Sequence, residues 1–390
     1  MTARKVKLGD LGEWGSGGTP LASRADYYGG DIPWLIIEDL NDEIVRKSAR
    51  NISNAGLENS SAKIVPPGTL LIAMYGSIGK LGLAEIECAT NQAIAFCKCD
   101  LSKVDTRFLF FLLLHERPHF IRSGRGGTQQ NINQEYLKNY EIYLPNLKEQ
   151  RQVAGQLEQT DRLRRTRRYA LELNETFLPA AFLEFFGNLH ENERKWSFGR
   201  LEEHSKIASG VAKGQRYGNT RTVEVPYLRV ANVQDGYLDL SEIKTIRVPP
   251  DDVEALRLQS GDIVMTEGGD FDKLGRGAIW PGGLADCIHQ NHIFRVRLDQ
   301  SSLLPRFFAA FLRSGFAKNY FLRCSKQTTN LASINMTQLR ATPTPLPPLP
   351  IQQKFVALVE RVESLRAVQR EALRQAEHLF TSLLNRAFSA

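Results

Sequence analysis

Hydrophobic and polar positions along the chain follow the same order of patterns twice. Short apolar runs bounded by glycine turns, such as "GTLLIAMY" (68–75) and "HIFRVRL" (292–298), predict β-strands. One denser apolar run in each half, "RFLFFLLLHE" (107–116) and "PRFFAAFLRS" (305–314), predicts a buried helix. Each half is therefore expected to contain an irregular α/β or β-rich domain.

A long helix is predicted after each of these domains, entered through proline, which is tolerated before a helix but not inside it. Positions spaced alternately by four and three residues form a heptad seam in the second of these helices, and it consists of Leu358, Val362, Leu365, Gln369, Ala372, Ala376, Leu379 and Leu383. The matching, more polar seam of the first helix consists of Thr160, Leu163, Arg167, Ala170, Asn174, Phe177 and Ala181. We expect the two helices to pair through these seams, and Pro179 to kink the first or end it early.

The two halves are copies of one another, offset by a little under 200 residues. "IPWLIIEDLND" (32–42) aligns with "VPYLRVANVQD" (225–235). "LPNLKEQRQVAGQLEQTDRLR" (144–164) aligns with "LPPLPIQQKFVALVERVESLR" (346–366). A unit this long is a domain with an appendage, not a solenoid repeat. The predicted divisions are a first domain at 1–145, a helix at 146–187, a second domain at 188–345 and a helix at 346–390.

Composition narrows the class of protein. Of 390 residues, 42% are hydrophobic and 24% charged, which is typical of a globular chain, and the net charge of +7 mildly favours a polyanionic partner. No apolar run is long enough for a transmembrane helix, no signal peptide is visible, and the five cysteines form no disulfide framework. The sequence predicts a cytoplasmic protein, with a zinc site of Cys88, Cys97 and Cys99 as a minor alternative.

Catalytic motifs are weak. "HERPH" (115–119) matches the HExxH pattern of zinc proteases, but Pro118 is expected to interrupt the helix that both histidines need, and the second copy has neither histidine. "GSIGK" (76–80) lacks the remaining residues of a phosphate-binding loop, and no adenine-methylase motif is present. We therefore predict no catalytic residues, no metal site and no cofactor bound by this chain.

Recognition chemistry is the stronger interpretation. Two loops at equivalent places, 122–133 and 323–335, are rich in Arg, Lys, Gln, Asn and Thr, whose side chains bond to base edges or phosphates. A third such loop spans 211–221, and lysines stand in two equivalent glycine-flanked turns. The predicted DNA-binding residues are Lys80, Arg125, Thr128, Gln129, Gln130, Asn131, Lys213, Gln215, Arg216, Arg221, Lys273, Arg276, Lys326, Gln327, Thr328 and Asn330. The run "RLRRTRRY" (162–169) remains open between phosphate contact, partner contact and a solvated surface.

The segments 9–40, 66–96 and 126–157, with their diverged second copies, resemble the specificity subunit of type I restriction–modification systems. The resemblance covers essentially the whole chain and lies in the order and duplication of loose motifs. It implies an α+β chain with two tandem target-recognition domains, each followed by a long helix, the two helices pairing as an antiparallel coiled coil.

The resemblance also implies a function. Each domain would read one half of a split target in double-stranded DNA, and the helices would set the gap. Two modification subunits carrying S-adenosylmethionine would dock on the helices, and restriction subunits using ATP and Mg²⁺ would join them. The residues predicted for the helix seam and partner docking are Leu163, Phe177, Leu358, Val362, Leu365, Ala372, Leu379 and Leu383.

Two alternatives stay open at this point. One is a similar recognition subunit serving another methylase-based defence system. The other is an enzyme in its own right, either a metalloprotease or a stand-alone methylase.

Overall fold

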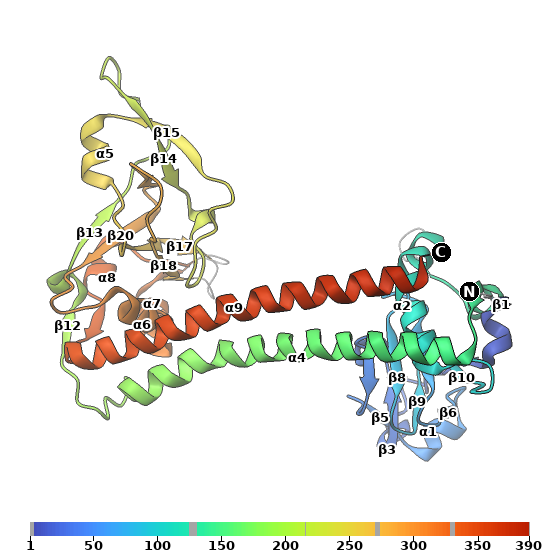
Figure 1. The fold of residues 1–390 in the computed structure, drawn as a ribbon. Coiled ribbons are helices and arrows are strands. Elements are labelled where there is room, and N and C mark those ends of the chain that lie inside the picture. Colours follow the sequence, from blue (N-terminus) through green and yellow to red (C-terminus); the bar gives the residue numbers. More distant parts are fainter. Residues whose placement is uncertain (1–3, 125–130, 215, 270–273, 328–331, 390) are drawn as a thin grey trace. The chain divides into compact units, whose positions relative to one another are not determined.

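The computed structural model describes residues 4–124, 131–214, 216–269, 274–327 and 332–389 (Figure 1). The chain forms two compact units, Met1–Arg168 with Glu371–Ala390, and Tyr169–Arg370. Each unit contains one mixed α/β domain and one half of each long helix. In the described part of the chain, no helix combines the length and apolar character needed to cross a bilayer.

The first unit is built on two sheets and a buried helix. Strand order is β2-β10-β7-β8-β4 in one sheet and β5-β3-β9-β6 in the other, and β1 pairs with β11. The elements are β1 (Arg4–Lys7), β2 (Gly12–Ser16), β3 (Tyr28–Leu35), β4 (Glu43–Val45), β5 (Asn51–Ile52), α1 (Asn54–Glu58), β6 (Ile64–Val65), β7 (Leu70–Ala73), β8 (Leu81–Ala84), β9 (Cys88–Thr90), β10 (Ile94–Cys99), α2 (Thr106–Ser123), α3 (Gln134–Asn139), β11 (Glu141–Leu144) and the first part of α4 (Leu147–Phe186).

The second unit repeats this plan. Its sheets run β13-β20-β16-β18 and β15-β14-β19, β12 pairs with β23, and a small sheet β17-β22-β21 is added. The elements are β12 (Phe198–Arg200), β13 (Ser205–Ser209), β14 (Val223–Leu228), β15 (Lys244–Val248), α5 (Pro250–Leu256), β16 (Ile263–Thr266), β17 (Gly268–Gly269), β18 (Gly277–Ile279), β19 (Ile288–His289), β20 (Ile293–Leu298), α6 (Pro305–Leu312), α7 (Gly315–Cys324), β21 (Lys326–Gln327), β22 (Ala332–Ser333), α8 (Met336–Arg340), β23 (Pro343–Pro345) and α9 (Leu349–Phe388). The duplication in the sequence is thus a duplication of the fold.

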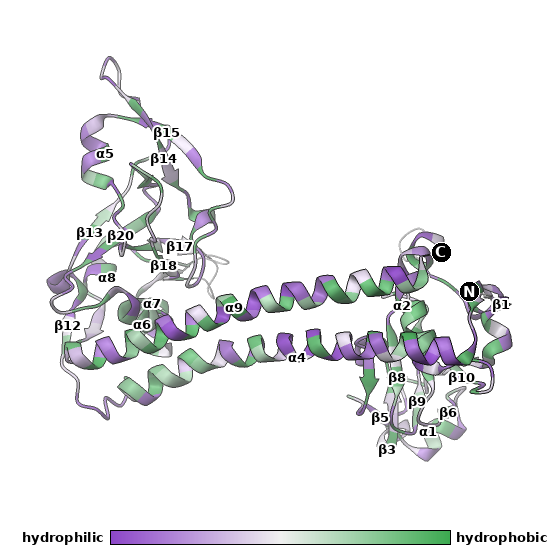
Figure 2. Ribbon diagram, in the orientation of Figure 1, coloured by the Kyte–Doolittle hydropathy of each residue, from purple (hydrophilic) through white to green (hydrophobic). Residues whose placement is uncertain are grey.

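Each domain core is closed by the end of a helix from the other repeat. In the first unit, Phe380 and Leu384 of α9 belong to the core formed around α2, and the Phe380 ring lies 6.1 Å from that of Phe111. In the second unit, Phe186 of α4 lies 4.7 Å from Phe307 of α6, centroid to centroid. Figure 2 shows the matching concentration of apolar residues toward the C-terminal end of α4. Because each helix packs by its far end against the other repeat's domain, α4 and α9 run antiparallel.

The helix seam differs from the predicted one in one of its two lines. Val362 and Ala376 are buried as expected, and Asn174 donates a hydrogen bond to Gln369 (2.5 Å). The second row of buried seam positions on α9 contains Val359 and Phe380. Leu365 and Leu379, predicted for the seam, are instead 53% and 44% exposed.

The same one-residue shift occurs in α4. Leu163 and Phe177, predicted for the seam, are 40% and 44% exposed. Arg164 takes the inner place and lies over the Phe380 ring at 4.1 Å, while Leu178 packs in the core of the second unit. Aromatic residues of the long helices pack in the domain cores and so determine which face of each helix turns inward. A heptad pattern read from the helix alone does not take this packing into account.

Two prolines proved less disruptive than predicted. Helix α2 continues through Pro118, and α4 continues through Pro179 to Phe186, so neither helix is interrupted or ends early. Both prolines are exposed, and each helix continues to an aromatic residue that is buried in a domain core, Phe120 after Pro118 and Phe182 after Pro179. Burial of these rings offsets the backbone hydrogen bond that a proline cannot make.

A buried glutamine fixes each long helix to its own domain. Gln150 accepts a hydrogen bond from the amide of Asp105 (2.8 Å), the residue that caps α2. Its amide nitrogen donates to the carbonyls of Lys103 (3.3 Å) and Pro145 (2.8 Å). The side chain is fully buried, so all three bonds form away from water.

Gln352 repeats the arrangement in the second unit. It accepts from the amide of Leu304 (2.9 Å), the residue before α6, and donates to the carbonyls of Ser302 and Pro347 (both 2.8 Å). In both units, one carboxamide therefore joins the start of the buried helix to the start of the long helix.

We predict that Gln150→Leu destabilises the first unit by about 3 kcal/mol, because it leaves one buried donor and two buried acceptors unpaired. Urea unfolding followed by circular dichroism measures this change. Gln156→Leu, an exposed position on the same helix, is the matched control and should change stability by less than about 0.5 kcal/mol. Equal effects of the two substitutions would show that the three hydrogen bonds of Gln150 contribute nothing to stability.

Candidate nucleic-acid interface

The structure brings two of the predicted recognition segments together in the first unit. The glycine turn after β7 lies beside the end of the loop before α3, since the amide of Ile132 donates to the carbonyl of Met74 (3.0 Å). Tyr75 and Asn131 form an antiparallel bridge next to that bond. Lys80 and Asn131 therefore belong to one surface, although about 50 residues separate them in the sequence.

The second unit joins the equivalent segments in the same way. The amide of Ile334 donates to the carbonyl of Glu267 (2.9 Å), and β17 pairs with β22, matching Gly268 with Ser333. Strand β21 carries the backbone of Lys326 and Gln327 against β22. The turn that leads to Arg276 and the loop that begins at Lys326 thus form the counterpart of the surface in the first unit.

Several predicted DNA-binding residues lie outside the described residues, and they are Arg125, Thr128, Gln129, Gln130, Gln215, Lys273, Thr328 and Asn330. The structure does describe neighbouring backbone segments, and the contacts between the glycine turns and the loops are made by these segments.

Two predicted cations are held by the protein. The Lys80 ammonium is half-buried and donates to the carbonyl of Ile37 (3.2 Å), which leaves two of its three donors available. The Arg276 guanidinium donates to the side-chain oxygen of Gln234 (3.3 Å), and its Nε has no partner among the described residues. Gln234 was not predicted; its only sequence signal is its place opposite Asn41 in the repeat.

Sequence reasoning also missed Arg117. Its guanidinium forks onto the carboxylate of Asp42 and donates from Nε to the carbonyl of Gly79 (2.8 Å). Gly79 has φ +75°, and an added Cβ would lie 3.0 Å from the Arg117 side chain. Arg117 therefore fixes the shape of the turn that presents Lys80.

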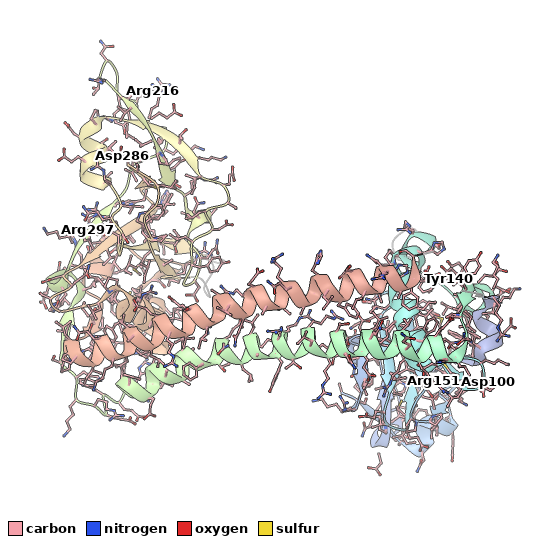
Figure 3. All side chains as sticks on the ribbon, viewed as in Figure 1. Asp100, Tyr140, Arg151, Arg216, Asp286 and Arg297 are labelled. Carbon is pink, nitrogen blue, oxygen red and sulfur yellow. The ribbon has the colours of Figure 1, made fainter. Side chains whose placement is uncertain are left out.

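The third predicted loop is a separate feature of the second unit. Lys213, Arg216 and Arg221 are exposed and have no side-chain partner among the described residues. Tyr217 packs against the core formed by Val225 and its neighbours, which anchors the loop from within. Figure 3 places Arg216 near the tip of this projection, away from β17 and β18 in the same unit. The structure therefore does not join these cations to the Arg276 surface.

The arginine run of α4 is mainly an internal network. Arg164 and Arg165 both pair with Asp161, and Arg165 also pairs with Glu43 at the start of β4. Arg168 pairs with Glu377 of α9 at 2.7 Å. Arg162 is exposed. Most of the run thus connects the helix to the rest of the first unit.

The HExxH segment forms no metal site. His115 lies beside Phe388 and His119 beside Tyr140, whose hydroxyl donates to Glu116. Among the described residues, no group of three or more His, Cys, Asp or Glu side chains is arranged to hold a metal ion. Cys88, Cys97 and Cys99, the alternative zinc ligands, are likewise part of no such group in the described part of the chain.

A buried histidine supports the base of the Lys213–Arg221 loop. His289 donates from Nδ1 to the carbonyl of Ile293 (2.9 Å), while its Nε2 has no partner among the described residues. The amide of Val211, where the loop begins, donates to the His289 carbonyl (3.0 Å). Burial, above all, lowers the pKa of His289 to about 4. The first unit has the neutral Thr90 at the equivalent position, also buried.

Comparison with known proteins identifies the family to which the chain belongs. The family model described as "Type I restriction modification DNA specificity domain" matches residues 2–173 and again 193–377. The chain belongs to this family. It is a type I restriction–modification specificity subunit with two tandem domains, as the resemblance in the sequence implied.

Individual relatives agree with this assignment. The type I restriction enzyme MjaIX specificity subunit of Methanocaldococcus jannaschii is 25% identical over 374 residues, 91% of this chain and 85% of the relative. The EcoR124I/EcoR124II specificity subunit of Escherichia coli is 24% identical over 163 residues, 40% of each chain. The fold is similar to the S subunit structure from M. genitalium, with a TM-score of 0.61 at 15% identity over 100% of this chain and 96% of that one.

We predict that the second unit loses stability as the pH falls from about 6.5 to about 4. The unfolded chain binds a proton at His289 in that range and the folded chain does not, so folding is disfavoured by up to about 3 kcal/mol. Urea unfolding at several pH values measures the slope. His289→Asn, which retains a donor near Nδ1, should flatten the slope, whereas the exposed control His378→Asn should leave it unchanged. An unaltered slope in His289→Asn would assign the pH dependence to other groups.

Proposed function

We propose that this specificity subunit reads a bipartite sequence in double-stranded DNA, one half with each domain, and directs partner subunits to it. The observation that carries the proposal is the repeated surface in which a glycine turn and an amide-rich loop are joined by one backbone hydrogen bond, at Ile132 and again at Ile334. Amide and guanidinium side chains in such loops suit base edges in the major groove. Because the loop sequences differ between the copies, the two half-sites should differ.

The long helices would set the separation of the half-sites. Each is a single helix of 40 residues, and each contributes one end to each domain core. The hydrogen bond between Asn174 and Gln369 fixes the register of the pair, as a polar residue in a coiled-coil seam does. A change in helix length should therefore appear as a change in the unread gap.

The helices would also carry the docking surface for two modification subunits. The side chains that the seam leaves outside, including Leu173, Leu365 and Val368, are 54%, 53% and 66% exposed. Apolar side chains at helical spacing on an exposed face suit a partner helix. Restriction subunits would join this core.

The chemistry would then belong to the partners. S-adenosylmethionine, ATP and Mg²⁺ are expected on the modification and restriction subunits and not on this chain.

Mapping methylated adenines in the source genome, with and without this gene, tests the proposal. A split motif that disappears with the gene and returns on complementation is the expected result. Methyl transfer by the purified chain without partners, or an unchanged methylation map, would refute it.

We predict that alanine at Gln129, Gln130 and Asn131 relaxes the preference at one half-site only, with discrimination falling by about 1–3 kcal/mol for each base that is no longer bonded. Methylation of a library of target variants measures this change. The matched variant in the second unit, with alanine at Gln327, Thr328 and Asn330, should relax the other half-site. Relaxation of both half-sites by either variant would contradict the assignment of one half to each domain.

We predict that one heptad inserted into both helices lengthens the gap by about three base pairs. Seven residues add about 10.5 Å of helix at 1.5 Å per residue, and the rise of DNA is about 3.4 Å per base pair. The insertions belong between Arg168 and Asn174 in α4 and between Gln369 and Glu377 in α9, so that the pairs on either side are kept.

The control for this design is the same heptad inserted into α4 alone. It should disrupt the pairing and lower the melting temperature, because the two pairs can no longer form together. Methylation of the original site by the double insertion would show that the helices are a tether and do not set the gap.

A further inference from the structure

The loop between β4 and β5 in the first unit, residues 46–50 with the sequence RKSAR, is held in a fixed shape. The hydroxyl of Ser48 donates to the carbonyl of Trp34 (2.9 Å) and accepts from the amide of Arg50 (3.1 Å). The amide of Ala49 donates to the carboxylate of Asp39 (3.1 Å). The carbonyl of Arg50 accepts from the amide of Trp34 (2.9 Å). Little conformational entropy remains to be lost when such a loop binds a ligand.

This loop presents cations without partners. Arg46 pairs with Glu85 at 2.6 Å. Lys47 and Arg50 are both exposed, and neither side chain has an ion pair or hydrogen bond among the described residues. Two free positive charges on a preorganised loop form a site for a polyanion.

The same scaffold in the second unit holds its cation in an ion pair. Lys244 takes the place of Arg50, since it lies opposite Tyr227 as Arg50 lies opposite Trp34, and it pairs with Glu242. Asn232 takes the place of Asp39, accepting from the amide of Arg229 (2.9 Å) as Asp39 accepts from that of Ile36 (2.9 Å). Its amide then donates to the carbonyls of Asp239 and Glu242, which lie in the corresponding loop. This loop carries acidic residues, and Glu242 is paired with cations.

Those cations are Arg229 at 3.1 Å and Lys244 at 3.5 Å, so none of the three charges is free. The free, unpaired cations of the loop in the first unit are therefore not a requirement of the shared scaffold.

The loop lies one strand away from the recognition surface of its own unit. At one end of β4, Asp42 bonds to Arg117 and accepts from the amide of Leu81 (2.9 Å), beside the turn that presents Lys80. At the other end, the loop begins at Arg46. A three-residue strand spans about 10 Å, which equals the axial rise of about three base pairs of DNA.

We propose that Lys47 and Arg50 bind a DNA phosphate beside the half-site read by the first domain, at a position where the second domain makes no such contact. The proposal rests on the proposed function of the chain in DNA recognition. The second domain presents free cations at a different place, on the loop with Lys213, Arg216 and Arg221. The two domains thus hold the DNA backbone from different places while using one fold to read bases.

The test compares two variants of the full chain, alone and assembled with its methyltransferase partner. The variant with Lys47→Ala and Arg50→Ala removes the free cations, and Arg46→Ala with Lys98→Ala removes two cations that are paired with Glu85 and Glu13. Fluorescence anisotropy with a duplex that holds the target and one that does not, between about 50 and 300 mM salt, gives the affinity and its salt dependence. Phosphate ethylation interference locates the phosphates that the protein binds.

The first variant should weaken binding to both duplexes by a similar factor and reduce the log–log salt slope by about one unit for each phosphate that is no longer bound. Interference should disappear at phosphates beside one half-site only, and the control should retain it. An unchanged slope, equally weakened binding in both variants, or weaker binding confined to the target duplex would overturn the proposal. Absence of sequence preference in the unaltered chain would instead refute the proposed function.

Discussion

The orientation of each long helix on its domain depends on one buried carboxamide. Gln150 and Gln352 each combine a donor and an acceptor in a place that water does not reach, and each uses both toward backbone groups at two helix starts. A hydrophobic residue could fill the same volume but would satisfy none of these groups. Since helix and domain are fixed together at this point, the helix cannot rotate about its axis without the domain. The domain therefore determines which face of the helix is turned toward the other long helix.

This dependence of the helix on its domain explains which residues form the seam. The leucine line of α9 has the more regular heptad, yet the structure turns Phe380 and Val359 inward instead. Phe380 is held by Phe111 in the first domain, and Phe186 is held by Phe307 in the second. Aromatic side chains bury more area than leucine and gain from edge contacts, so the domain cores set the phase of the helices and the coiled-coil pattern follows.

Features that show as an internal repeat or as a periodic hydrophobic pattern could be predicted from the sequence. The duplication, the buried helices and the two long helices are all present, and the family assignment agrees. Features that depend on long-range contact could not be obtained. The fork of Arg117 on Asp42 joins residues 75 positions apart, and the Lys80 ammonium donates to the carbonyl of Ile37, a contact that no local pattern indicates. Most of the arginine run in α4 faces acids of its own unit, which composition alone could not show.

The exchange of helix ends has a consequence for the order in which the protein is completed during synthesis. The first domain emerges from the ribosome early, but its core includes Phe380 and Leu384, which are made more than about 200 residues later. The second domain has Phe186 available before its own strands are made. The first domain should therefore wait in an incompletely packed state with the face of α2 exposed, while the second folds at once. The domain translated first would be the last to mature.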